Sequence, residues 1–340
     1  MKILIIGGTK FLGRHLTRAA LKNNHEVTLF NRGRKYVDES VPDVEQIHGD
    51  RNSDLEKLNS RNWDAVIDTC GYLPQTVKTS AEFFAGKAGQ YVFISSGSVY
   101  TDTSKPDYDE HTETARLNDE QKKEVEKIDP RGELTGPVLG EYYGALKKLC
   151  EEAAERAMPN RVLNVRAGMI VGAFDWTDRF AYWVMRVGRG GEVLAPGSGE
   201  NFVQLIDARD LSEWIIKMIG ENETGIFNAT SKSLDLTFGK FLGAMRAATG
   251  SDAEFVWADE KFLTENAVAP WSEMPFYLPG PAQNFLTMNV HRALSKGLTF
   301  RPLSDTILDV FNWRKNQNFE MKAGISPERE RELLGKLYKQ

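Results

Sequence analysis

Residues 2–13, Lys2-Ile3-Leu4-Ile5-Ile6-Gly7-Gly8-Thr9-Lys10-Phe11-Leu12-Gly13, decide the fold of this chain. The apolar run at 2–6 predicts a buried strand, and a helical pattern follows the glycines. A glycine turn lets the backbone approach a pyrophosphate, while the helix N-terminus offers N–H groups and a positive dipole end. We therefore predict a dinucleotide site formed by Gly7, Gly8, Thr9, Lys10, Phe11, Leu12 and Gly13. The alternative is a glycine turn that binds nothing.

Apolar strands alternate with helices along the first half of the chain. Strands are expected at 26–31, 44–48, 63–68, 90–100 and 161–166, with helices at about 75–88 and 143–157. This alternation indicates parallel βαβ units. We predict an α/β fold of the Rossmann type, a doubly wound parallel sheet, with a smaller C-terminal substrate-binding lobe.

The expected domains follow from this pattern. The NAD(P)-binding domain spans 1–170, with an excursion at 101–136 and a strand-helix-strand unit at 204–230 that returns to the sheet. The smaller lobe takes 171–203 and 231–325, and a C-terminal helix takes 326–340. The excursion is polar and long, which is typical of either a lid or a disordered segment.

The end of the second strand predicts the cofactor. An NAD site normally carries an acid there for the ribose hydroxyls, but this chain has Asn31, followed by Arg32 and Arg34. Because guanidinium groups bind phosphate well, NADP(H) is favoured, with NAD(H) as the other option. The alternative is that these arginines form only a solvated loop.

Further cofactor contacts are expected where the next strands end, since ligands gather at the carboxyl ends of parallel strands. Asp50 is positioned to accept a hydrogen bond from the adenine amino group, and Arg51 follows it. Thr69, Cys70 and Gly71 close the strand at 63–68, where the ribose and nicotinamide are expected.

Tyr143 and Lys147 are candidates for proton transfer. Four residues apart on a helix, they share one face, so an ammonium group there would lower the pKa of the phenol. Ser95, Ser96 and Ser98 lie near the end of the strand at 90–100 and are candidate hydroxyl donors. A lone tyrosine and lysine at this spacing would more often be ordinary helix-surface residues.

The segment 174–183 is dense in aromatic and charged residues just past a strand end. It is a candidate substrate wall, with Trp176 and Arg179 as contacts beside Ser98. The alternative is a helix whose aromatic stripe, including Phe180 and Trp183, packs into the core.

Charge and composition exclude some functions. A net charge of -5 argues against a binder of nucleic acid or membrane surfaces. The N-terminal apolar run is too short for a signal peptide or a membrane span, so we expect a cytoplasmic protein. The two cysteines, Cys70 and Cys150, and the absence of metal-binding motifs predict free thiols and no metal.

Taken together, the chain from Met1 to about Trp313 resembles the extended short-chain dehydrogenase/reductase superfamily, the NAD-dependent epimerase/dehydratase family. The resemblance rests on Gly7–Gly13, the serine strand, Tyr143-x-x-x-Lys147 with Glu151, Arg166–Gly172, Asp207–Leu211 and Phe227-Asn228. The usual middle glycine is Lys10 here, so the G-G-x-x-x-x-G motif looks more like an atypical subgroup.

The resemblance implies roles for single residues. Ser96, four before Tyr100, polarises the substrate oxygen, Tyr143 transfers the proton, and Lys147 lowers its pKa and holds the nicotinamide ribose. Gly97-Ser98 stands where sugar dehydratases carry Asp-Glu, which disfavours dehydration. Val203 replaces the arginine that grips the phosphate in nucleotide-sugar enzymes, leaving Arg179, Arg186 or Arg189 for that role.

Three hypotheses follow. The first is an NAD(P)-dependent oxidoreductase that transfers hydride to or from a small alcohol or carbonyl compound. The second is a nucleotide-sugar epimerase with tightly bound NAD, and the third is a non-catalytic RNA-binding or regulatory protein. The family resemblance also implies a homodimer through the helices at 75–88 and 143–157 as an option.

Overall fold

The computed structural model describes residues 1–33, 44–317 and 320–339. A seven-stranded sheet lies at its centre in the order β10-β6-β5-β4-β1-β2-β3, with every neighbouring pair parallel. Its strands are β1 (Lys2–Ile6), β2 (Glu26–Asn31), β3 (Glu45–His48), β4 (Trp63–Asp68), β5 (Ala88–Ser96), β6 (Val162–Ala167) and β10 (Gly225–Ala229). The predicted Rossmann-type fold is confirmed, and the strand order reverses between β1 and β4, where such sheets bind ligands.

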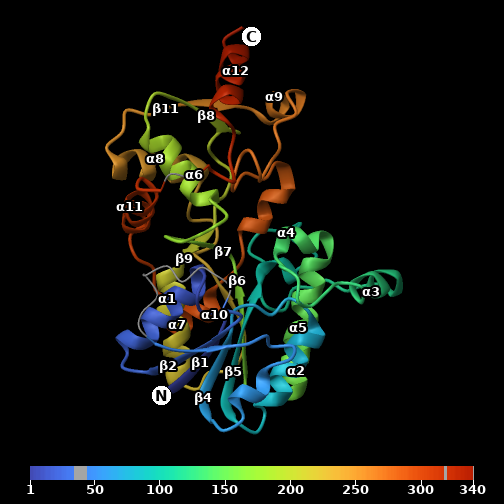
Figure 1. Ribbon diagram of the computed structural model, residues 1–340. Coiled ribbons are helices and arrows are strands. Elements are labelled where there is room, and N and C mark those ends of the chain that lie inside the picture. Colours follow the sequence, from blue (N-terminus) through green and yellow to red (C-terminus); the bar gives the residue numbers. More distant parts are fainter. Residues whose placement is uncertain (34–43, 318–319, 340) are drawn as a thin grey trace.

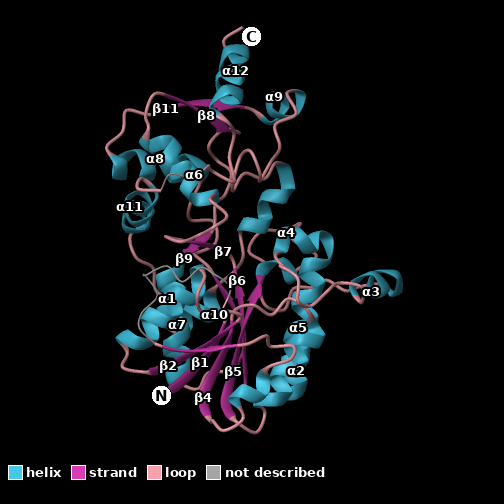
Figure 2. Ribbon diagram, in the orientation of Figure 1, coloured by secondary structure: helices cyan, strands magenta, loops and turns pink. Residues whose placement is uncertain are grey.

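Helices cover both faces of this sheet (Figures 1 and 2). The pairs are α1 (Phe11–Lys22) with α7 (Ala208–Gly220), and α2 (Pro74–Phe84) with α5 (Tyr143–Ala157). Ile3 and Ile5 of β1 join the core that includes Leu16 of α1. Leu4 and Ile6 join the opposite core, because successive side chains of a strand point to opposite faces.

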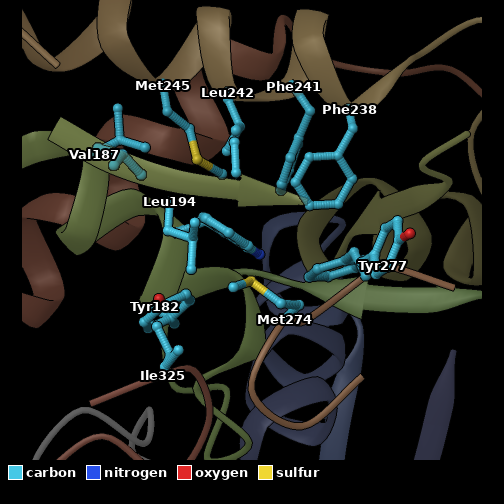
Figure 3. Packing of buried hydrophobic residues seen from close by; sticks show 14 of the residues in the cluster. Tyr182, Val187, Leu194, Phe238, Phe241, Leu242, Met245, Met274, Tyr277 and Ile325 are labelled. Carbon is cyan, nitrogen blue, oxygen red and sulfur yellow. The ribbon is translucent and has the colours of Figure 1, made fainter. Parts of the chain in front are cut away.

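A second lobe lies beyond the carboxyl ends of the strands (Figure 1). It contains α6 (Arg179–Gly188), β8 (Glu192–Pro196), α8 (Phe238–Thr249), β11 (Glu254–Ala258), α9 (Glu260–Glu265), α11 (Leu303–Arg314) and α12 (Pro327–Leu337). In Figure 3, Phe238, Phe241, Leu242 and Met245 of α8 face Leu194 of β8 across this lobe's core. The lobe therefore has its own apolar interior.

The connection between the lobes differs from the prediction in one strand. β9 (Leu205–Asp207) pairs with β7 (Met169–Val171) in a separate two-stranded sheet, while α7 and β10 return to the main domain. Its three residues are all buried, and they run on directly into α7 through the N-cap Asp207. The apolar pattern of 204–211 thus predicted a strand but not its partner.

The excursion at 101–136 is held to the body at several points. The Tyr108 hydroxyl donates to the Phe285 carbonyl at 2.8 Å, and the Asn228 backbone donates to Glu110 Oε1 at 2.8 Å. Its α3 (Asp119–Val125) is capped by Asn118 and buries none of its residues, and it projects from the body in Figure 1. The remaining short helices are η1 (Leu55–Leu58), η2 (Gly97–Val99), α4 (Gly136–Leu139), η3 (Gly140–Tyr142), η4 (Gly280–Leu286) and α10 (His291–Ser295).

Two further findings concern the protein's surroundings. Among the described residues, no helix combines the length and apolarity that crossing a bilayer requires. The exposed sides of α2 and α5 carry Lys78–Glu82 and Lys148–Glu152 ion pairs, so dimerisation through these helices stays a prediction.

Candidate active site

The glycine turn fits a dinucleotide phosphate group. Gly7 and Gly8 have φ of +103° and +83°, and a Cβ on Gly7 would lie 2.3 Å from Thr69 Oγ1. A Cβ on Gly13 would lie 2.4 Å from the Gly8 Cα, so only glycine allows α1 to start this close to β1. The first turn of α1 carries neither a side-chain cap nor an acid, and such an uncapped helix start favours an anion. Thr9 and Lys10 lie in the glycine turn before the helix, and Phe11 and Leu12 begin α1.

The end of β2 forms the expected adenosine side of the site. Asn31 Oδ1 accepts hydrogen bonds from Gly33 N at 2.9 Å and His48 Nδ1 at 3.1 Å, so it shapes the turn. Arg32 Nη1 donates to the Arg131 carbonyl at 2.9 Å, which brings a second arginine here from the excursion. Sequence reasoning missed Arg131, since its sequence separation gave no signal, and Arg34 lies outside the described residues.

Asp50 and Arg51 have different surroundings. Burial raises the pKa of Asp50, but hydrogen bonds from Asn52 and the charges of Arg32 and Arg131 outweigh it and lower that pKa. Arg51 is buried and forms a double ion pair with Asp68, at 2.7 and 2.6 Å. Its other donors reach Ser80, so the predicted cofactor ligand instead ties the loop after β3 to β4.

The residues after β4 border the glycine turn. Thr69 Oγ1 donates to the Ile6 carbonyl at 2.8 Å, and Cys70 N donates to Asp68 Oδ1 at 3.1 Å. The Cys70 thiol is half-buried, and burial raises its pKa. Its neighbour Gly71 presents its carbonyl to the lysine of α5. Thr69, Cys70 and Gly71 therefore lie, as predicted, at the end of β4, where the strand order reverses between β1 and β4.

Ser96 and Tyr143 meet at the end of β5. The Ser96 side chain lies close enough to Tyr143 to lower the pKa of its phenol, and Ser96 Oγ donates to Ser98 Oγ at 3.1 Å. The meeting requires Gly144, because a Cβ there would lie 2.0 Å from the Ser98 carbonyl oxygen. Ser95 donates to Glu151 at 2.6 Å, so it is committed elsewhere and Ser96 and Ser98 remain as candidate hydroxyls.

Lys147 is oriented differently from the expectation. Its ammonium donates to the carbonyls of Gly71 at 2.9 Å and Ile94 at 2.5 Å, and it lies 4.2 Å from the Phe93 ring centroid. Burial raises the pKa of Tyr143, with the Ser96 hydrogen bond opposing it, so the expected lowering by Lys147 is not found. Tyr143 is therefore held in its protonated form.

The substrate wall separates into two parts. Phe180 and Trp183 are fully buried in the second lobe, which confirms core packing for them. Trp176 is 44% exposed, with Lys322 5.6 Å from its ring, and Arg179 lies 5.5 Å from the ring of Trp271. Trp271 was absent from the predicted wall because it is distant in sequence.

Comparison with known proteins gives a consistent result. The family model described as NAD dependent epimerase/dehydratase family matches residues 3–229. An Arabidopsis thaliana protein named chloroplast stem-loop binding protein of 41 kDa b is 26% identical over 266 residues, covering 73% of this chain and 63% of that protein. The chain thus spans less than two thirds of this relative.

Two solved structures share the fold. The human epimerase family protein SDR39U1 with NADPH has a TM-score of 0.58 at 19% identity, covering 93% of this chain and all of that one (100%). The Bordetella bronchiseptica enzyme WbmH with NAD+ has a TM-score of 0.65 at 13% identity, covering 94% and 99%. Relatives in fold thus bind either nicotinamide cofactor.

Proposed function

The chain belongs to the NAD dependent epimerase/dehydratase family, and is thus an NAD(P)-dependent enzyme; on that premise we propose that it reduces a small carbonyl compound, or oxidises the matching alcohol, with a preference for NADP(H). The observation that carries the proposal is that the Ser96 and Tyr143 side chains meet at the carboxyl end of β5, close enough for Ser96 to lower the pKa of Tyr143. Hydride transfer to a carbonyl needs a proton donor at its oxygen and a second hydrogen bond to the developing alkoxide. These two hydroxyls supply both.

Three side chains would carry out distinct tasks. A bound nicotinamide cofactor supplies or accepts the hydride. Tyr143, protonated because burial raises its pKa, donates its proton to the substrate oxygen. Ser96 hydrogen-bonds the same oxygen. Lys147 uses two of its three N–H donors on Gly71 and Ile94, which leaves the third for a cofactor hydroxyl.

The cofactor preference rests on the end of β2. Asn31 adds no charge that would repel a 2′-phosphate, and its amide oxygen is occupied by Gly33 and His48. Arg32 and Arg131 lie together here, and both act electrostatically on Asp50. Guanidinium groups at this position favour NADP(H) over NAD(H).

Coenzyme titration and a variant test the proposal. Calorimetry should give tighter binding of NADPH than NADH, and NADPH consumption should appear with some member of an aldehyde and ketone panel. Tyr143→Phe should abolish that turnover and leave NADPH binding unchanged, with Tyr142→Phe as the neighbouring control. Turnover that survived Tyr143→Phe would refute the proton-transfer role.

Two other functions remain as candidates. The family description names epimerases, and a protein purified with NAD that dialysis does not remove would favour that reaction. The name of the Arabidopsis relative raises stem-loop binding, which the net charge of -5 disfavours. A gel-shift titration with an RNA hairpin would test it. The name of that relative also places it in the chloroplast, so a cytoplasmic location stays a prediction.

A further inference from the structure

The excursion rejoins α5 through residues 129–139, which we call the return leg. The return leg begins with a tight turn, in which Gly132 N donates to the Asp129 carbonyl at 3.1 Å and Arg131 N donates to Asp129 Oδ1 at 2.9 Å. It ends with α4, which is capped by Thr135 and packs against α5 (Figure 1). The return leg therefore has two ordered ends, and they contact different parts of the predicted cofactor site.

The turn of the return leg lies on the adenosine side of that site. The Arg131 carbonyl accepts a hydrogen bond from Arg32 Nη1 at 2.9 Å, and the Pro130 carbonyl accepts one from Asn52 Nδ2 at 3.4 Å. The guanidinium of Arg131 is near enough to Asp50 to act on it electrostatically, as the guanidinium of Arg32 does. Two guanidinium groups from positions 99 residues apart therefore gather around one carboxylate at the end of β2.

The other end of the return leg covers Tyr143. A Cβ on Gly136 would lie 3.6 Å from Tyr143 Cε1 and 3.7 Å from Tyr143 Cζ, so the backbone of α4 lies against the phenol ring. Leu139 is buried and shares an apolar cluster with Leu146 of α5, and both Leu134 and Tyr143 pack against this cluster. A displacement of α4 would therefore change the surroundings of the proposed proton donor.

The charges at the adenosine end favour a phosphate. Like charges repel, so Arg32 and Arg131 are stabilised by an anion that both can reach. Asp50 supplies only one negative charge, and its Oδ1 already accepts hydrogen bonds from Asn52 N and Asn52 Nδ2, each at 2.8 Å. A phosphate monoester carries about two negative charges and three acceptor oxygens. Because a guanidinium has five N–H donors, Arg32 can bind a phosphate and keep its bond to the Arg131 carbonyl.

We propose that Arg131 is a second ligand of the cofactor 2′-phosphate and that this phosphate holds the return leg in place over Tyr143. The proposal rests on the proposed function, because it starts from a site that binds NADP(H). It deepens that function, since the identity of the cofactor would then control the segment that covers the proton donor. NADH, which has a hydroxyl in place of the phosphate, should bind without holding the return leg.

Hydrogen exchange tests this coupling without a substrate. The backbone amides of 131–139 should exchange about tenfold more slowly in protein saturated with NADPH than in protein saturated with NADH, as one charge-assisted hydrogen bond gives. The amides of α3 are the control, because this helix belongs to the same excursion and buries none of its residues. Equal exchange of the return leg in the two complexes would overturn this proposal alone if NADPH still bound more tightly. Failure of both cofactors to bind would overturn the proposed function as well.

Variants of the turn test the ligand. Arg131→Gln should weaken NADPH binding about tenfold in calorimetry, leave NADH binding unchanged and remove the difference in exchange. Arg131→Lys keeps the charge and should retain part of the preference for NADPH. Lys123→Gln is the matched control, since it removes one positive charge from an exposed position of α3. An unchanged NADPH affinity in Arg131→Gln would refute the assignment.

A variant at the other end tests whether the two ends are coupled. Leu139→Ala loosens the contact with α5, and coupling between two sites is reciprocal, so it should weaken NADPH binding about fivefold or more and leave NADH binding unchanged. Val138→Ala is the control, because its side chain lies in the same helix and is 65% exposed. A purely structural role of Leu139 would change the affinities for both cofactors equally or not at all, and either result would contradict the coupling.

Discussion

Arg166 and Glu151 form a double ion pair beneath the active site, with Nε–Oε1 at 2.9 Å and Nη2–Oε2 at 2.8 Å. Both side chains are only 2% exposed. Ser95 donates to the same carboxylate, and Arg166 also donates to the Tyr100 hydroxyl at 2.9 Å. The pair therefore joins α5, which carries Tyr143, to the ends of β5 and β6.

Glu151→Gln should destabilise the protein strongly. It leaves the buried Arg166 charge uncompensated, which costs on the order of 3 kcal/mol. Urea unfolding measures this loss, and turnover should fall with it because α5 loses its anchor. Glu152→Gln is a matched control, since its pair with Lys148 is partly exposed and contributes less than about 1 kcal/mol. Equal losses for the two variants would contradict this role.

Carbonyl reduction should persist to high pH. The active form of Tyr143 is the protonated phenol, and burial raises its pKa above the usual value of about 10. The profile of kcat/KM for reduction should therefore be flat from neutrality to about pH 10 with respect to this group, since it reports the free enzyme. A fall centred between pH 7 and 8 would show that Tyr143 is not held protonated.

Arg32→Ala should weaken NADPH binding about tenfold and leave NADH binding unchanged. The loss reflects one charge-assisted hydrogen bond to the 2′-phosphate, which NADH lacks. Calorimetry with both cofactors measures it. Arg61→Ala is the control, because Arg61 pairs with Glu45 on the edge strand. If Arg32→Ala weakened NADPH and NADH binding equally, Arg32 would not be a ligand of the 2′-phosphate.

Asp175→Asn should stabilise the protein at pH 7. Burial raises the pKa of Asp175 to about 6, whereas the unfolded value is about 3.9. The folded state therefore binds more protons between about pH 4 and 6, and stability falls as pH rises through that window. Removing the carboxylate should raise the free energy of unfolding by up to about 3 kcal/mol at pH 7 and should not change it near pH 3.5. Urea unfolding of both proteins at these two pH values measures the difference, and identical gains at both would contradict it.

Local patterns predicted most of the fold. The apolar run of β1 and the start of α5 at Tyr143 follow from short stretches of sequence, and the structure has both. The pairing of β9 with β7 does not, because three buried residues carry no information about their partner. The glycine turn was also predictable, since its backbone conformation needs glycine.

The direction of charged side chains was not predictable. Arg51 follows a strand end like a ligand would, yet the buried Asp68 attracts it inward. Arg179 stands in an ordinary charged segment, yet its guanidinium lies over the ring of Trp271, which is distant in sequence. The direction of a charged side chain depends on which opposite charge or aromatic ring the tertiary fold brings close to it.

The contact of Gly144 with the Ser98 carbonyl has a consequence for reading mutational data on this protein. A saturation screen scored by activity would rank position 144 with Ser96 and Tyr143, because any added side-chain atom separates those two hydroxyls. Yet glycine here has no group that could bind or react. Loss of activity on substitution at position 144 would reflect the short distance between two backbone segments. The absence of such variants from the active pool would therefore report the spacing of the site and not its chemistry.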